Sequence, residues 1–147
     1  MRTGIRLDEA AARQYALATG WDPAGPGEQA GDLHAFYRGL TAPPHPHGGP
    51  FAYVSANTDL LGWAIERAAD KPFADLLSEF LWRPMGAEAD ASWQLDRAGN
   101  ELGYTGFQAV PRDYARLGLL MARAGRAGDR QVVPTSWVAA MTRSHIP

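Results

Sequence analysis

Apolar positions recur at intervals of three and four residues through most of the chain, the spacing that places side chains on one face of an α-helix. The pattern predicts helices over residues 7–19, 28–40, 57–68, 72–82, 111–124 and 135–141. Asp8 is placed to cap the first helix and Gly20 to end it. In residues 57–68 the apolar positions run nearly all round the helix, so we expect this helix to be buried on most of its surface.

Alternating or glycine-broken segments between these helices predict a few short extended pieces. They are residues 51–55, residues 91–108 with a turn at 96–99, and the pair Val132 and Val133. Two segments rich in proline and glycine, residues 22–27 and 42–50, interrupt the regular structure. The expected fold class is therefore mainly α with short β segments.

The composition narrows the classes of function. The 147 residues include 14 basic and 16 acidic side chains, for a net charge of −2, and Lys71 is the sole lysine. Because no basic stripe is present, we expect no nucleic-acid partner. No apolar run approaches the roughly 20 residues of a membrane span, and no apolar segment of a secretory signal follows Met1. We therefore expect no membrane partner.

The residue types that bind metals are sparse. The chain has no cysteine, which removes disulfides, thiolate metal sites and cysteine nucleophiles together. Its histidines lack the i, i+4 spacing of a helical metal pair; they are His34, His45, His47 and His145. We therefore expect neither a metal nor a cofactor.

A tyrosine followed by small polar residues stands at the junction between the extended segment 51–55 and the next helix. A phenol in this position can act as a general base when a nearby cation favours the phenolate. Ser55 points to the same side as Tyr53 while the chain stays extended, and Asn57 or Thr58 is placed to cap the helix. The alternative is that Tyr53 is a partly buried packing residue, the commoner role of a tyrosine before a helix.

Two further segments carry polar groups with simpler interpretations. Arg112 and Arg116 lie four positions apart, with Asp113 in the first turn of a predicted helix, where the helix dipole favours a carboxylate. We interpret this segment as a solvated helix face. His47 before two glycines is compatible with an anion-binding nest, but the surrounding prolines favour a turn.

Residues 51–63, with the sequence FAYVSANTDLLGW, are similar to the tyrosine motif of serine hydrolases related to class C β-lactamases. The resemblance is strongest to the 6-aminohexanoate-dimer hydrolase branch, with carboxylesterases and DD-peptidases as relatives. It continues through residues 1–5 (MRTGI), 82–86 (WRPMG), 96–99 (DRAG), 111–118 (PRDYARLG) and 132–138 (VVPTSWV). The order and spacing of these segments carry the resemblance, not any one of them.

The resemblance implies acyl transfer by a serine nucleophile. In the family a Ser-x-x-Lys pair supplies the nucleophile, and a Tyr-x-Ser/Asn motif supplies a tyrosine that shuttles the proton. Tyr53 and Ser55 match this second motif and are the implied catalytic residues, while Asn57 is a candidate for substrate binding with a structural role as the alternative. The implied substrate is a small-molecule amide, ester or β-lactam. The implied fold is a partial β-lactamase/transpeptidase-like α+β fold.

The sequence departs from the family pattern in two places. The residue three positions before Lys71 is Ala68, so Ser-x-x-Lys is absent, and His47-Gly48-Gly49 precedes the tyrosine, whereas the family's Lys/His-x-Gly element lies far beyond it. We therefore expect residues 1–147 to be the helical middle region of an incomplete domain, inactive alone, with exposed apolar faces that favour self-association. The alternative is a non-catalytic truncated gene product or an interaction module on the same scaffold.

Overall fold

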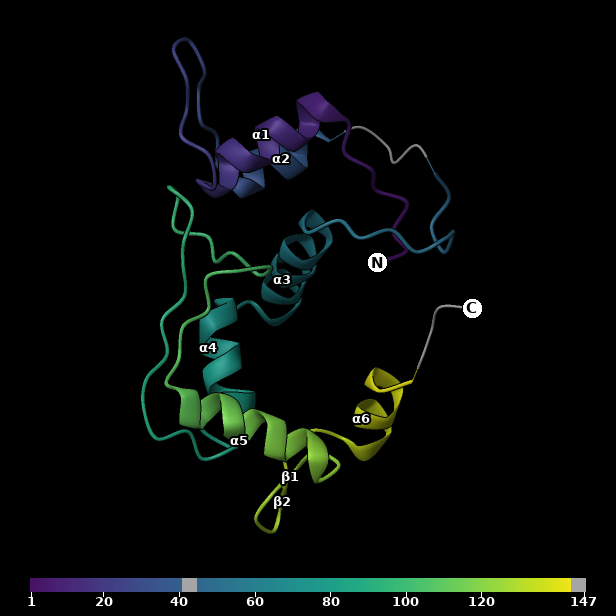
Figure 1. The fold of residues 1–147 in the computed structure, drawn as a ribbon, viewed down its shortest axis with the longest axis vertical. Helices are drawn as coiled ribbons and strands as arrows, with labels where there is room; N and C mark the ends of the chain where they lie inside the picture. The colour runs from purple at the N-terminus through teal and green to yellow at the C-terminus, as the bar shows by residue number, and fades with distance from the viewer. Residues whose placement is uncertain (41–44, 144–147) are drawn as a thin grey trace. The chain divides into compact units, whose positions relative to one another are not determined.

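A computed structural model describes residues 1–40 and 45–143 of the chain (Figure 1). The chain divides into two compact units. The first unit comprises Met1–Ala69 and Trp93–Gly106, and the second comprises Asp70–Ser92 and Phe107–Pro147. Each unit has its own hydrophobic core, so each is described by itself.

The first unit contains three helices: α1 (Glu9–Thr19), α2 (Leu33–Gly39) and α3 (Ala56–Ala69). α1 begins two residues later than predicted, but its predicted cap and end are confirmed, because Asp8 accepts a hydrogen bond from the Ala11 amide and Gly20 has a φ of 72°. α2 begins five residues later than predicted. Asp32 caps it by accepting from the Ala35 amide at 2.9 Å, and this cap fixes the helix start there.

Six buried residues form the core of the first unit: Ala18, Leu33, Phe36, Tyr37, Ala56 and Leu102. From α3, the partly buried Leu60 and Trp63 pack against this core. Leu61 is 60% exposed and Ile65 is 37% exposed; four positions apart, they share a different face of the helix. The prediction that this helix is buried on most of its surface is therefore wrong. Its apolar side chains extend over more of the helix surface than the core covers.

The segment 93–106 returns to the first unit through the turn predicted at 96–99. The Asp96 amide donates to the Asn100 carbonyl at 2.8 Å, which closes the turn. The Asp96 carboxylate also accepts from the amides of Ala98 and Asn100, and from the Leu33 amide at the start of α2 at 2.8 Å. One buried carboxylate thus joins the turn to a helix 63 residues away in the sequence.

The second unit contains the remaining elements: α4 (Phe73–Leu77), the π-helix η1 (Ser78–Trp82), α5 (Pro111–Ala122), β1 (Arg126–Ala127), β2 (Arg130–Gln131) and α6 (Thr135–Met141). The predicted helix over 72–82 is present, but its last turn is wider than an α-helix. β1 and β2 pair antiparallel. The extended pair predicted at Val132 and Val133 is not a strand, because both amides donate to the Gly125 carbonyl and bend the chain there.

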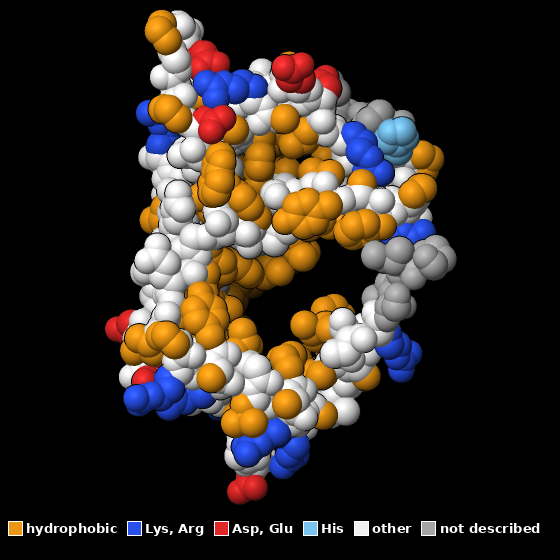
Figure 2. Space-filling view, viewed as in Figure 1, with side chains coloured by type: hydrophobic (Ala, Val, Ile, Leu, Met, Phe, Trp, Pro, Cys, Tyr) orange, Lys and Arg blue, Asp and Glu red, His pale blue; other side chains and the backbone are white. Residues whose placement is uncertain are grey.

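The second unit packs around three buried residues, Trp82, Met85 and Leu120. Large apolar side chains remain on its surface, among them Trp137 at 62% and Met141 at 58% exposure. Figure 2 shows hydrophobic side chains, in orange, on the surface of the face that it presents. Within the described residues, no helix is long and apolar enough to cross a membrane. The mainly helical class with little sheet agrees with the sequence prediction, whereas self-association through the exposed side chains stays a prediction.

Candidate functional site

An irregular segment runs directly before α3 (Figure 1). It belongs to the first unit and contains Tyr53. The side chain of Tyr53 is 76% exposed, so Tyr53 is not the partly buried packing residue considered as the alternative. The neighbouring backbone is held by the N-terminus, since the Ala52 amide donates to the Met1 carbonyl at 3.2 Å and the Val54 amide to the Met1 sulfur at 3.3 Å. Within residues 1–40 and 45–143, no hydrogen-bond partner meets the Tyr53 hydroxyl.

The start of α3 differs in detail from the sequence prediction. The helix begins at Ala56, and the amides of Asn57 and Thr58 donate to the carbonyls of Val54 and Ser55 at 3.0 and 2.9 Å. Neither Asn57 nor Thr58 is therefore the capping residue. Asn57 is buried, and its side-chain oxygen accepts from the Thr3 hydroxyl at 2.5 Å. This contact gives Asn57 a structural duty, and substrate binding by Asn57 stays a prediction.

A buried carboxylate that sequence reasoning missed lies one turn after Ser55. Asp59 is 4% exposed and accepts hydrogen bonds from the Tyr15 hydroxyl and from the Tyr104 amide, the latter at 3.1 Å. The Tyr37 hydroxyl lies 3.5 Å from the same carboxylate. The one signal in the sequence was an acid beside two leucines, in a helix whose apolar positions predicted burial on most of its surface.

The environment of this cluster sets its protonation states. Burial raises the pKa of Asp59, although the hydrogen bonds from Tyr15 and the Tyr104 amide oppose that rise. Burial and the adjacent Asp59 raise the pKa values of Tyr15 and Tyr37 well above the ordinary 10.0. The two phenols therefore remain neutral donors at physiological pH. This arrangement suits a structural anchor rather than an acid–base pair.

In the second unit, Asp113 is fully buried, so the interpretation of its segment as a solvated face is wrong at this residue. Its carboxylate accepts from the amides of Glu88 and Ala89 at 2.9 and 3.2 Å and from Arg116 at 2.7 Å. Burial opposes ionisation, but these hydrogen bonds outweigh it and hold the pKa of Asp113 below its ordinary value. Arg112, at 79% side-chain exposure, does belong to a solvated face.

The predicted turn at His47 is confirmed. The Gly49 amide donates to the Pro46 carbonyl at 3.3 Å, and the Gly48 amide donates to the Arg2 carbonyl at 2.7 Å. Because these amides are engaged with the protein's own backbone, they form no anion-binding nest. Across the part of the chain that is described, no three acidic or histidine side chains gather to hold a metal ion; His145 lies outside that part.

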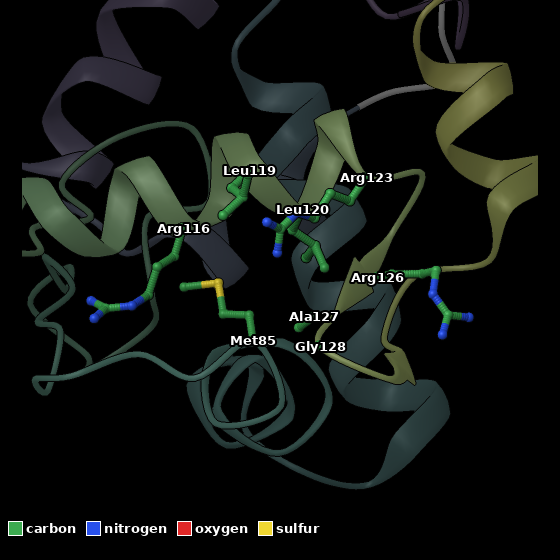
Figure 3. Close-up of a pocket in the computed structure, with 8 residues that line it drawn as sticks. All are labelled: Met85, Arg116, Leu119, Leu120, Arg123, Arg126, Ala127 and Gly128. Atoms are coloured by element: carbon green, nitrogen blue, oxygen red, sulfur yellow. The ribbon is translucent and has the colours of Figure 1, made fainter.

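The second unit also has an open pocket of about 190 Å³ beside α5 and the β1–β2 turn (Figure 3). Its apolar lining includes Met85, Leu119 and Leu120, and its charged lining is Arg116, Arg123 and Arg126. In Figure 3 the side chains of Arg116 and Arg126 point in different directions. No hydroxyl, imidazole or carboxylate lines the pocket, so its described lining offers nothing for acyl transfer.

Comparison with known proteins shows that part of this chain has a homologue. No family model matches the chain. Over 90 residues, or 61% of this chain, the sequence is 38% identical to the 6-aminohexanoate-dimer hydrolase of Paenarthrobacter ureafaciens, of which the match spans 23%. The solved "putative 6-aminohexanoate-dimer hydrolase from Bacillus anthracis" matches with a TM-score of 0.78 and 26% identity, over 98% of this chain and 38% of that one. The chain is homologous to a part of 6-aminohexanoate-dimer hydrolase.

Proposed function

We propose that residues 1–147 are the tyrosine-bearing portion of a serine hydrolase with a β-lactamase/transpeptidase-like fold. The complete enzyme transfers an acyl group from an amide, ester or β-lactam to water. The observation that carries this proposal is an exposed phenol, Tyr53, directly before a helix start that is tied into the core. Homology to part of 6-aminohexanoate-dimer hydrolase supports it.

Tyr53 moves the proton in this proposal. The serine hydroxyl attacks the carbonyl carbon, Tyr53 in its phenolate form accepts the serine's proton, and the same proton then passes from the phenol to the leaving nitrogen or oxygen as its bond to carbon breaks. Water attacks the acyl-serine in the second half, with the proton moving from water through Tyr53 back to the serine. Ser55 donates or accepts a hydrogen bond beside the reacting groups.

The serine nucleophile is not supplied by these residues. A Ser-x-x-Lys pair needs a lysine, and Lys71, the sole lysine, follows Ala68 by three positions. Lys71 is instead bound to Glu79 at 2.5 Å, in the other unit from Tyr53. We therefore expect no hydrolysis from residues 1–147 alone, and we assign the nucleophile to another segment or another chain.

The proposal is tested by grafting. In the Bacillus anthracis protein, the part that matches this chain is replaced by residues 1–147, and turnover of p-nitrophenyl esters, nitrocefin and the 6-aminohexanoate dimer is measured. Turnover by the chimaera, abolished by a serine-directed fluorophosphonate, supports the proposal and identifies the substrate class. The unmodified host is the positive control.

Residues 1–147 alone are the negative control for the same substrates. Turnover by this chain alone that the fluorophosphonate abolishes would show that the nucleophile lies within it, with Ser55 the first candidate. A folded chimaera that hydrolyses none of the substrates turned over by its host would favour the non-catalytic interaction module.

A further inference from the structure

The first turn of α3, which directly follows Ser55, is fastened to two remote segments. The Tyr37 hydroxyl, from α2, donates to the Ala56 carbonyl at 2.8 Å. The Thr3 hydroxyl, from the N-terminal segment, donates to the side-chain oxygen of Asn57 at 2.5 Å. Both acceptors belong to buried residues. The two residues after Ser55 are thus held from two directions.

A third tie comes from α1. The Tyr15 hydroxyl donates to the Asp59 carboxylate, which also accepts from the Tyr104 amide. The Tyr15 ring itself contacts the rings of Phe36 and Tyr104, with centroids 5.5 and 5.7 Å away. Because these ring contacts hold the Tyr15 side chain, its hydrogen bond to Asp59 links the first turn of α3 to α1.

Tyr53 has no such support of its own. Its side chain is 76% exposed, and its hydroxyl has no partner within the described residues. The placement of the phenol is therefore set by the backbone of residues 52–56. Reacting groups must be held to within about 0.5 Å of the productive geometry, and a misplacement of about 1 Å can cost about a hundredfold in rate.

We propose that Tyr15 and Asp59 are positioning residues that fix the start of α3 and, through it, the catalytic Tyr53. The inference rests on the proposed function for the role of Tyr53, but not for the positioning itself. A residue that only stabilises the unit would loosen all of it equally when removed. A positioning residue loosens residues 53–58 first.

Amide hydrogen exchange in residues 1–147 separates these two cases. With Tyr15→Phe, which removes the hydroxyl alone, we expect the amides of Asn57 and Thr58 to exchange about ten- to a hundredfold faster. The amides of Asp96 and Asn100, hydrogen-bonded elsewhere in the same unit, should change less than about twofold. Equal acceleration throughout the first unit, or none at Asn57 and Thr58, would overturn the proposal.

Two further variants serve as a second test and as a control for the hydrogen-exchange measurement. Thr3→Val removes another tie to the same turn and should accelerate the same amides if Tyr15→Phe proves too unstable to study. Tyr114→Phe is the matched control, because the Tyr114 hydroxyl also donates one hydrogen bond, to the Phe107 carbonyl at 2.8 Å in the second unit. Tyr114→Phe should leave the exchange of Asn57 and Thr58 unchanged.

The chimaera supplies the link to function. There Tyr15→Phe should lower kcat at least about tenfold while KM stays within about twofold, since it displaces the phenol without touching the substrate. If Tyr15→Phe accelerates amide exchange at the start of α3 but leaves kcat unchanged, the positioning of this turn by Tyr15 is supported and the proton-transfer role of Tyr53 is refuted. Unchanged exchange with a lowered kcat would refute the positioning and leave the proposed function standing.

Discussion

Replacing Tyr37 by Phe has opposite effects on stability at neutral and at alkaline pH. The ring of Tyr37 is 8% exposed, and its hydroxyl donates to the Ala56 carbonyl at 2.8 Å. Tyr37→Phe keeps the ring and leaves that carbonyl without its donor. The cost at neutral pH is about 1–2 kcal/mol, the range for a hydrogen bond lost in a buried site.

The change that Tyr37→Phe causes in the free energy of unfolding reverses its sign as the pH rises. The folded-state pKa of Tyr37 is raised above the unfolded value of 10.0, first by burial and then by Asp59. The folded phenol therefore keeps its proton where the unfolded one loses it. Its contribution to stability is complete below about pH 10 and falls by about 1.4 kcal/mol per pH unit above that. Tyr37→Phe has no phenol at this position and does not lose this stability. The free energies of unfolding of the variant and the parent, plotted against pH, should therefore cross near pH 11.

The assay is urea denaturation of residues 1–147 followed by far-ultraviolet circular dichroism, at several values between neutral pH and about pH 11.5. Tyr15→Phe should show the same convergence, because burial and Asp59 also raise the pKa of Tyr15. Tyr114→Phe is the control, since that side chain is 44% exposed. A constant difference between Tyr37→Phe and the parent across this range would refute the reasoning.

Two further changes test the second unit. Asp113→Asn should lower the thermal midpoint of this unit at neutral pH, whereas Arg112→Ala should not. Because hydrogen bonds hold the pKa of Asp113 below the ordinary 3.8, its stabilisation should be complete above about pH 4 and disappear as the pH falls through the folded value; a difference that persists in acid would contradict this. Gly125→Ala should cost well over about 1 kcal/mol, because its φ is 85° and an added Cβ would lie 1.9 Å from the Val133 carbonyl oxygen. Gly128→Ala, with a φ of 56° and open space, should cost only about 1 kcal/mol, and equal urea midpoints for the two variants would be the contrary result.

Local signals in the sequence predicted the helices well where a cap or a proline marks the end. Asp8 and Gly20 bound α1 as expected, and Pro111 opens α5. α2 was predicted to begin at residue 28, although its apolar positions start only at Leu33, and the structure shows that Asp32 is the cap. The spacing of apolar residues indicates which residues share a helix face. It does not indicate the residue at which a capping side chain begins the helix.

The exposure of α3 could not be predicted for a different reason. Leu61 and Ile65 are as apolar as the residues that pack against the core. How much of a helix is covered depends on the area that other elements offer, and this is a property of the tertiary structure rather than of the helix. The same holds for Asp59, whose partners Tyr15 and Tyr104 lie 44 and 45 positions away.

The candidate site was predicted from the family resemblance and not from the residue pattern. Taken alone, a tyrosine before a helix favours packing, and only its 76% exposure in the structure removes that interpretation. The catalytic roles of Tyr53 and Ser55 stay predictions. The ties that hold the turn beyond them depend on long-range contacts, so no local pattern could have indicated them.

The most direct test of the central claim compares kcat/KM for Tyr53→Phe and Ser55→Ala in the chimaera that carries residues 1–147. Loss of the proton shuttle in Tyr53→Phe should lower kcat/KM by about 10²–10⁴-fold. Ser55→Ala removes one hydrogen bond and should cost about one to two decades at most. The thermal midpoint of Tyr53→Phe should match the parent, since its exposed ring is retained. A Tyr53→Phe chimaera with the kcat/KM of its parent would contradict the claim that Tyr53 moves the proton.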